Sequence, residues 1–424
     1  MGGAGAERPP LRLPTIDSRP VTIAIVICAL VAVCVAIAPA ASASVEIAAA
    51  GDISCPADST REHKISPGEP EPRPAGQKCK GHRVATMIKA EKPKAVLALG
   101  DLIQGQKSVF KAYADFSRAW VSVLHKKIFS TPGNHDYRRD SKSGKVTASG
   151  YFKYWKHKDA PPVKYGKPGL GWSSWNVGRW HMINLNSNCF AIDCSFASRQ
   201  LRWLRRDLKA DRRKRKTKCT LAYFHHPLFS TGVFRGRNPK GSLLVNVWEL
   251  LYRYRTDIVL NGHQHHYERF APQNPSGRPD STGITQIISG TGGANTFPVE
   301  DEKGRLSRNS EASYRGLGAT FLKLGNGKYR TYFRDLDGAI HDPTPVRKCN
   351  KPNAGAKRRA PRTRRYEKHM NRLQKLHRKI RKQRKLIKRL ESTPVTPPHR
   401  LKSARKRLGK SLHGYRRVRE SPLY

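Results

Sequence analysis

The chain has 424 residues, which is enough for two or three domains. Hydrophobic residues make up 37% of it, so a sizeable core is possible, but a large part of the chain must lie outside that core. The formal net charge of +51 is extreme; it indicates an anionic partner such as nucleic acid, anionic lipid or acidic polymer, and says little about the fold.

The first 43 residues have the pattern of an export signal. Three arginines precede an apolar run from Val21 to Ala38, and Ala41-Ser42-Ala43 fits a small-residue cleavage site. The alternative is an uncleaved membrane anchor, because a run of about 18 apolar residues can nearly span a bilayer. Either way we expect the body to lie outside the cytoplasm, secreted or associated with the cell envelope.

Six cysteines remain after such a cleavage, and an even count in an exported chain predicts disulfides. Their spacing does not resemble a structural zinc site. Several disulfide connectivities are open. In the one that we favour, one bond closes a small loop, the second joins the ends of a Pro-rich insertion, and the third fixes the end of the body. These pairs are Cys189–Cys194, Cys55–Cys79 and Cys219–Cys349.

Apolar runs alternate with amphipathic stretches along the body. We expect strands at 45–50, 95–99, 128–129, 172–177, 181–185, 220–224, 258–260, 284–289, 319–325 and 329–334. Helices are expected at 84–90, 110–120, 200–208 and 243–252. Residues 56–80 are a Pro-rich loop, and the polar, aromatic segment 138–170 is expected to shape a rim around a site. This alternation predicts an α/β body that ends near Cys349.

Five of the predicted strand ends carry side chains of the metal-ligand type. They are Asp52, Asp101, Asn134-His135, His225 and the pair His263/His265. Sites in α/β sheets form at the carboxyl ends of strands. Each residue alone has a plain structural reading, since an Asp after Gly is often a cap or turn former and a histidine pair can be buried core. The joint pattern at five strand ends indicates a site.

The donor set predicts the metals. Carboxylate or amide oxygens from three residues and three imidazoles suit Mn, Fe or Zn. Six ligands exceed what one catalytic zinc needs, so we expect two ions, with Asp101 as the bridging ligand.

This ordered set resembles the calcineurin-like metallophosphoesterases, over roughly residues 45–340. Three further segments resemble secreted bacterial members of the purple acid phosphatase branch: Tyr267-Glu268-Arg269, His225-His226-Pro227 and Gly290-Thr291-Gly292-Gly293. The resemblance implies a four-layer α/β/β/α sandwich of two mixed sheets.

The resemblance also implies the role of each ligand. One metal would be held by Asp52, Asp101 and His265. The other would be held by Asp101, Asn134, His225 and His263. His135 would stabilise charge or protonate the leaving group.

One position departs from the branch. A tyrosinate ligand is expected three residues after the bridging Asp, and Gln104 stands there. The amide oxygen of Gln104 or a water would take its place, and the identity of the metals stays open. His226 and His266 lie beside ligands and could serve as outer groups, substrate contacts or structural residues; we favour a structural role for His266.

These features predict an exported binuclear phosphoesterase that hydrolyses phosphate monoesters by attack of a metal-bound hydroxide. A phosphodiesterase using the same site is the rival enzyme. A polyanion-binding envelope protein with an inactive or structural metal site is the rival of another class.

The tail at 350–424 holds 27 Lys and Arg against three Asp and Glu. Apolar residues spaced by three and four predict an amphipathic helix at about 366–391, and residues 392–424 are expected to be disordered. The helix is either solvated or bound to an anionic membrane surface or envelope polymer, with nucleic acid as a further polyanion.

Overall fold

The computed structural model describes Gly2 and residues 44–54, 79–104, 109–139, 144–156, 169–196, 198–214, 216–232, 244–299, 305–350, 360–393 and 397–419. The chain divides into two units, Met1–Ala43 and Ser44–Tyr424. Apart from Gly2, the predicted export signal lies outside the described residues, as does Cys55, so both predictions stay untested. No helix in the described ranges combines the length and apolar character needed to cross a membrane.

The first sheet has the strand order β15-β14-β13-β1-β2-β3, with β16 paired to β14. Its strands are β1 (Val45–Ala50), β2 (Ala95–Ala98), β3 (Ile128–Ser130), β13 (Gly318–Leu324), β14 (Lys328–Asp335), β15 (Ile340–His341) and β16 (Arg347–Lys348). The sheet is mixed, because β1, β2 and β3 run parallel while β13 and β14 are antiparallel to their neighbours.

The second sheet has the order β12-β10-β11-β9-β8-β7-β6. Its strands are β6 (Ser173–Val177), β7 (Trp180–Asn184), β8 (Cys219–Tyr223), β9 (Ile258–Asn261), β10 (Tyr267–Phe270), β11 (Thr285–Ser289) and β12 (Ser310–Tyr314). It is also mixed, since β7, β8, β9 and β11 run parallel and the outer strands are antiparallel. The sequence pattern did not predict β10, β12, β15 and β16.

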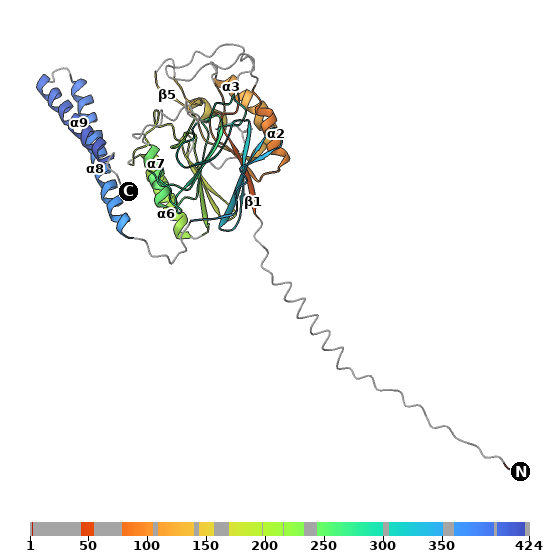
Figure 1. The fold of residues 1–424 in the computed structure, drawn as a ribbon. Coiled ribbons are helices and arrows are strands. Elements are labelled where there is room, and N and C mark those ends of the chain that lie inside the picture. The colour runs from red at the N-terminus through yellow and green to blue at the C-terminus, as the bar shows by residue number, and fades with distance from the viewer. Residues whose placement is uncertain are drawn as a thin grey trace. The chain divides into compact units, whose positions relative to one another are not determined.

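Helices cover the outer face of each sheet (Figure 1). The first sheet is covered by α2 (Gly81–Ala90) and α3 (Val109–Phe116). The chain continues from α3 through η1 (Ser117–Val121), α4 (Ser122–Leu124) and η2 (His125–Lys127). The second sheet is covered by α6 (Arg199–Lys214) and α7 (Leu244–Arg253). The α/β/β/α sandwich of two mixed sheets is therefore confirmed.

Side chains along β1 alternate between the two faces of the first sheet, and this alternation shows how the layers form. Ala48 and Ala50 point to the helix side, where they join a core that contains Val84 and Trp120. Ile47 and Ala49 point the other way, into a core shared by both sheets. Successive side chains of a strand face opposite sides, so a strand buried on both faces is apolar at every position.

The segment at 138–170 contains regular structure that the sequence did not predict. Within it, β4 (Arg138–Arg139) pairs with β5 (Val146–Thr147), and α5 (Ser149–Lys156) follows. Tyr151 of α5 is buried, and its hydroxyl hydrogen-bonds Ser130 Oγ at 2.7 Å. The aromatic residues of α5 thus pack in the core beside β3.

Two of the favoured disulfides are confirmed, Cys189–Cys194 and Cys219–Cys349. The second joins the start of β8 to the end of the body and closes 130 residues of chain. Cys79 is also disulfide-bonded.

The tail forms two helices that pack side by side, α8 (Ala360–Glu391) and α9 (Pro398–Arg419) (Figure 1). The predicted seam on α8 is present, because Ile380 and Ile387 are buried. The expectation of disorder is wrong for residues 398–419. Pro398 suits the first position of a helix, and the buried residues of α9 include the small Ala404 and Ser411, which give a weak apolar pattern in the sequence.

A buried carboxyl group on α7 predicts a pH-dependent stability. Burial raises the pKa of Glu249 to about 8, and its Oε2 has no hydrogen-bond partner in the described ranges. Between the ordinary value of 4.5 and about 8, the folded state keeps a proton that the unfolded state has released, so stability falls as pH rises through this range. Glu249→Gln should raise the Tm by on the order of 5 °C at about pH 8 and flatten the pH profile.

Thermal unfolding from about pH 5 to pH 9 measures this effect, with the exposed Glu391→Gln as the matched control. A Glu249→Gln variant whose pH profile of Tm matches that of the wild type would contradict the assignment.

Candidate metal centre

Five strands deliver the predicted ligands to one edge of the fold. In the first sheet, β1, β2 and β3 are followed within four residues by Asp52, Asp101 and Asn134. In the second sheet, β8 and β9 are followed by His225 and His263. The two edges meet, because Asp101 Oδ2 lies 3.2 Å from His225 Nε2. Ligands predicted from both sheets therefore converge.

The Asp52 carboxylate is completely buried, and its backbone has a φ of 59°. Its Oδ2 accepts a hydrogen bond from the His263 amide at 2.8 Å. Its Oδ1 lies 3.2 Å from His265 Nε2 and has no hydrogen-bond partner among the described residues. A buried carboxylate oxygen without a partner is costly, so this atom is a candidate metal ligand.

Asp101 lies between the other ligands. Its backbone φ is 48°, and its Oδ1 accepts the His135 amide at 2.7 Å. Oδ2 faces His225 and lies 3.9 Å from His135 Nε2. Burial raises the pKa of Asp101, but His225 and His135 outweigh burial and hold that pKa well below its usual range. The group is therefore ionised, as a bridging ligand must be.

His225 and His265 share one arrangement. His225 donates from Nδ1 to the Leu99 carbonyl oxygen at 2.9 Å, and His265 donates from Nδ1 to the Asn295 carbonyl oxygen at 2.6 Å. His265 also stacks on Phe297 with ring centroids 4.5 Å apart. These contacts fix the tautomer and leave Nε2 of each ring as the atom that can bind a metal.

The arrangement around His225 calls for a cation. With Nδ1 donating, neutral His225 has a bare Nε2, yet this atom lies 3.0 Å from Asn134 Oδ1 and 3.2 Å from Asp101 Oδ2. Three lone-pair donors that converge without a proton repel one another. In the metal-free protein a proton relieves this, since Asp101 raises the pKa of His225 to about 9 although burial lowers it. A divalent cation satisfies the same three atoms, so the residues fit the predicted metal.

Glycines allow the loops to come this close. A Cβ on Gly133 would lie 2.0 Å from Asp101 Oδ1, and a Cβ on Gly262 would lie 2.8 Å from Asp52 Oδ2. Any side chain at Gly133 or Gly262 would displace a carboxylate of the site. Packing against the two carboxylates thus explains why glycine precedes the ligand residues in the Gly-Asn-His and Gly-His-x-His motifs.

His226 and His266, the two histidines beside the predicted ligands, differ in position. The ring of His226 lies 4.9 Å from that of His225 and 4.6 Å from that of His263, and its Nδ1 hydrogen-bonds Ser187 Oγ. His225, His226 and His263 are close enough to share an ion. His266 is completely buried, with Nε2 3.4 Å from Glu268 Oε2, as a structural residue would be. Gln104 is buried, and its Nε2 has no hydrogen-bond partner in the part of the chain that the structure describes.

Sequence reasoning missed several supporting groups. Asp136 follows His135, but its carboxylate turns back to accept the Gly133 amide and the Tyr113 hydroxyl. Burial, followed by the charge of Asp101, raises the pKa of Asp136 to about 7. Glu268 accepts both the amide and the hydroxyl of Thr231, which anchors the loop after His226.

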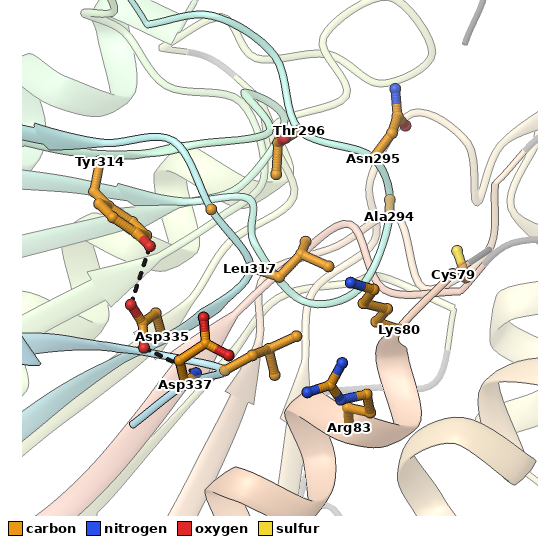
Figure 2. A pocket seen from close by; sticks show the side chains of 12 residues that line it. Cys79, Lys80, Arg83, Ala294, Asn295, Thr296, Tyr314, Leu317, Asp335 and Asp337 are labelled. Carbon is orange, nitrogen blue, oxygen red and sulfur yellow. Dashed lines mark hydrogen bonds between the residues drawn. The ribbon is translucent and has the colours of Figure 1, made fainter. Parts of the chain in front are cut away.

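A polar pocket adjoins the loop that positions His265. Its volume is about 260 Å³. Figure 2 shows Lys80, just before α2, and Arg83 of α2 on one side of it and Asp335 and Asp337 on the other. Asn295, whose carbonyl accepts from His265, also lines it. With cations and carboxylates both present, the lining selects neither an anion nor a cation.

The comparisons agree with this geometry. Residues 63–267 match the family model "Calcineurin-like phosphoesterase", a range that includes all the predicted ligands except Asp52. Purple acid phosphatase 13 of Arabidopsis thaliana is 33% identical over 153 residues, covering 35% of this chain and 27% of that protein. Acid phosphatase type 7 of Danio rerio is 30% identical over 122 residues, covering 24% and 27%. The chain thus spans just over a quarter of the length of these relatives.

Solved structures with a similar fold include a purple acid phosphatase. That protein comes from yellow lupin (Lupinus luteus) seeds, and it matches this chain with a TM-score of 0.55 and 17% sequence identity. The match covers 72% of this chain and 54% of that chain.

The Asp101 arrangement predicts how metal content responds to mutation. For the two ions that the sequence predicts, Asp101→Asn should lower the bound metal to fewer than one ion per chain, because the shared ligand loses its charge. The exposed Asp337→Asn, which lies in the polar pocket and not among the ligands, should keep both ions. Elemental analysis after dialysis measures this, and circular dichroism verifies that the variants fold. Two ions retained by Asp101→Asn would rule out its bridging role.

Proposed function

We propose that this chain, which contains a calcineurin-like metallophosphoesterase domain, is an exported enzyme with a binuclear metal centre that hydrolyses phosphate monoesters. The convergence of ligands from both sheets on the ionised Asp101 carries the proposal. The acid phosphatases among its relatives support the monoester substrate.

We propose the ligand assignment that the family resemblance implies, and the contacts of Asp52 with His265 and of His225 with Asp101 and Asn134 support it. Asp52 and His265 would hold one ion, Asn134, His225 and His263 would hold the other, and Asp101 would bridge them. When bound, two divalent cations lower the pKa of a water molecule and neutralise phosphate oxygens. The uncharged amide of Gln104, in place of a phenolate, favours a divalent pair of Mn, Fe or Zn over ferric iron.

His135 is the group that we propose acts on the leaving oxygen. Its side chain is 29% exposed, whereas that of Asp101 is 2% exposed. Its amide is held by Asp101 Oδ1, so the loop that carries the ring is fixed to the ligand set. A partly open imidazole beside a buried carboxylate can hold a proton and deliver it to an alkoxide.

Activity after metal replacement tests the function. The chelated protein refilled with Mn, Zn or Fe should hydrolyse 4-nitrophenyl phosphate, and Asp101→Asn should abolish turnover. His135→Ala should lower kcat for an alkyl phosphate roughly 100-fold, and for 4-nitrophenyl phosphate by less, because that leaving group needs no proton. Asp337→Asn is the matched control.

The same assay separates the rival functions. Preference for bis(4-nitrophenyl) phosphate would identify the phosphodiesterase. A folded protein that binds two ions but turns over neither ester with any metal would identify the polyanion-binding protein.

We further propose that the tail holds the exported enzyme on an anionic envelope polymer or membrane surface. Sixteen Lys and Arg side chains in the described part of α8 and α9 are exposed, and Glu391 is the one exposed acid there. Positive charges on two adjacent helices repel one another, so the high density of Lys and Arg does not stabilise the packing of α8 on α9. Its attraction for a polyanion should weaken as salt rises.

Truncation after Asn350 tests the tail and preserves Cys219–Cys349. The truncated protein should keep full kcat and lose salt-sensitive binding to anionic vesicles and to polyphosphate. Sedimentation with vesicles of anionic or neutral lipid measures this, and a duplex DNA probe reports the nucleic-acid alternative. Unchanged vesicle and polyphosphate binding by the truncated protein would contradict the proposal.

A further inference from the structure

Phe190 is the most exposed large hydrophobic side chain in the described ranges, with 61% of its surface accessible. It lies in the small loop closed by Cys189–Cys194. A phenyl ring left in water forgoes much of the stabilisation that its burial would give. An exposed aromatic ring of this kind is a candidate binding surface if the loop holds it in place and if it lies near the candidate metal centre.

The loop holds this ring in one place. Besides the disulfide, the amides of Ala191 and Ile192 both donate to the Asn188 carbonyl oxygen at 2.9 Å. Asn188 in turn donates from Nδ2 to the Pro132 carbonyl oxygen at 2.9 Å. The loop is thus tied to the segment that carries Asn134 and His135, and little conformational entropy is lost when a ligand meets the ring.

The ring lies beside the candidate metal centre. It makes an edge-to-face contact with Tyr137, with centroids 5.6 Å apart, and Tyr137 follows His135 by two residues. It makes a second edge contact with His226 at 6.5 Å. The ring of His226 is 4.6 Å from that of His263. Phe190 therefore contacts both loops that carry predicted ligands, while most of its surface stays exposed to solvent.

We propose that Phe190 is a platform for the leaving group of the substrate, so that the site selects phosphate monoesters of aryl or other planar, ring-bearing alcohols over those of small aliphatic alcohols. This inference rests on the proposed phosphoesterase function. With the phosphate at the candidate metal centre, an alcohol that extends toward Phe190 would meet a flat apolar surface. Such a surface stacks on an aromatic ring and contributes little to the binding of glycerol.

Kinetics of Phe190→Ala with two substrates test the platform. The KM for 4-nitrophenyl phosphate should rise about tenfold, with kcat changed less than about twofold, since the ring binds substrate and takes no part in the chemistry. The KM for glycerol 2-phosphate should stay within about twofold of the wild-type value. Phe190→Tyr should restore the aryl KM, because it keeps the ring.

Val346→Ala is the matched control, since Val346 is 59% exposed and lies between β15 and β16 of the first sheet. It should leave both KM values unchanged. Equal changes in both substrates for Phe190→Ala, or no change in either, would overturn the platform. A fall in kcat with both substrates that Phe190→Tyr does not rescue would overturn it as well.

Binding of non-hydrolysable phosphonates separates failure of the platform from failure of the function. Metal-loaded wild-type protein should bind phenylphosphonate more tightly than methylphosphonate in calorimetry, and Phe190→Ala should lose the preference. If neither ester is turned over but the preference and its loss are observed, the hydrolase proposal fails, and Phe190 is a binding surface for ring-bearing ligands but not for a leaving group. If the esters are turned over and no preference exists, the platform fails alone.

Discussion

The contact between Asp101 and His225 joins the edges of the two sheets, and the arrangement of the candidate metal centre depends on it. One oxygen of Asp101 accepts the His135 amide, and the other faces His225 Nε2 at 3.2 Å. Because the first sheet supplies Asp101 and the second supplies His225, any shift of one sheet on the other would separate the ligands. The shared core between the sheets, which includes Leu97 and Tyr223 from the same two strands, resists that shift.

Three of the predicted ligands occupy backbone conformations that an isolated chain would rarely adopt. Asp52, Asp101 and His263 all have positive φ, between 48° and 71°. Non-glycine residues in this region cost on the order of 1 kcal/mol each, and such residues persist where the surroundings over-determine them. Here the surroundings are buried parallel strands on one side and hydrogen bonds among the loops on the other, such as the His263 amide to Asp52. The strands therefore offset the strain that brings the side chains together.

The sequence could predict that these side chains converge, because each follows an apolar run, and such runs form strands whose carboxyl ends meet at one edge. It could not predict the carbonyl groups of Leu99 and Asn295, which orient His225 and His265, because every residue carries a carbonyl and only the fold selects one. β12 (Ser310–Tyr314) was missed for a related reason. Its residues are half-buried or exposed, so the strand lacks the apolar pattern that marks β9.

The Tyr267-Glu268-Arg269 segment shows how groups outside the ligand set hold it in place. Glu268 accepts the amide and hydroxyl of Thr231, and Arg269 and Tyr267 both bind Asp342. The loop after His226 is thus fastened to β10, and β10 is fastened to the segment after β15. Since His263 and His265 immediately precede β10, the same anchor fixes both histidine-bearing loops. Metal ligands must be placed to a fraction of an ångström, and this polar network can fix the predicted ligands in a way that apolar packing, which has no directional preference, cannot.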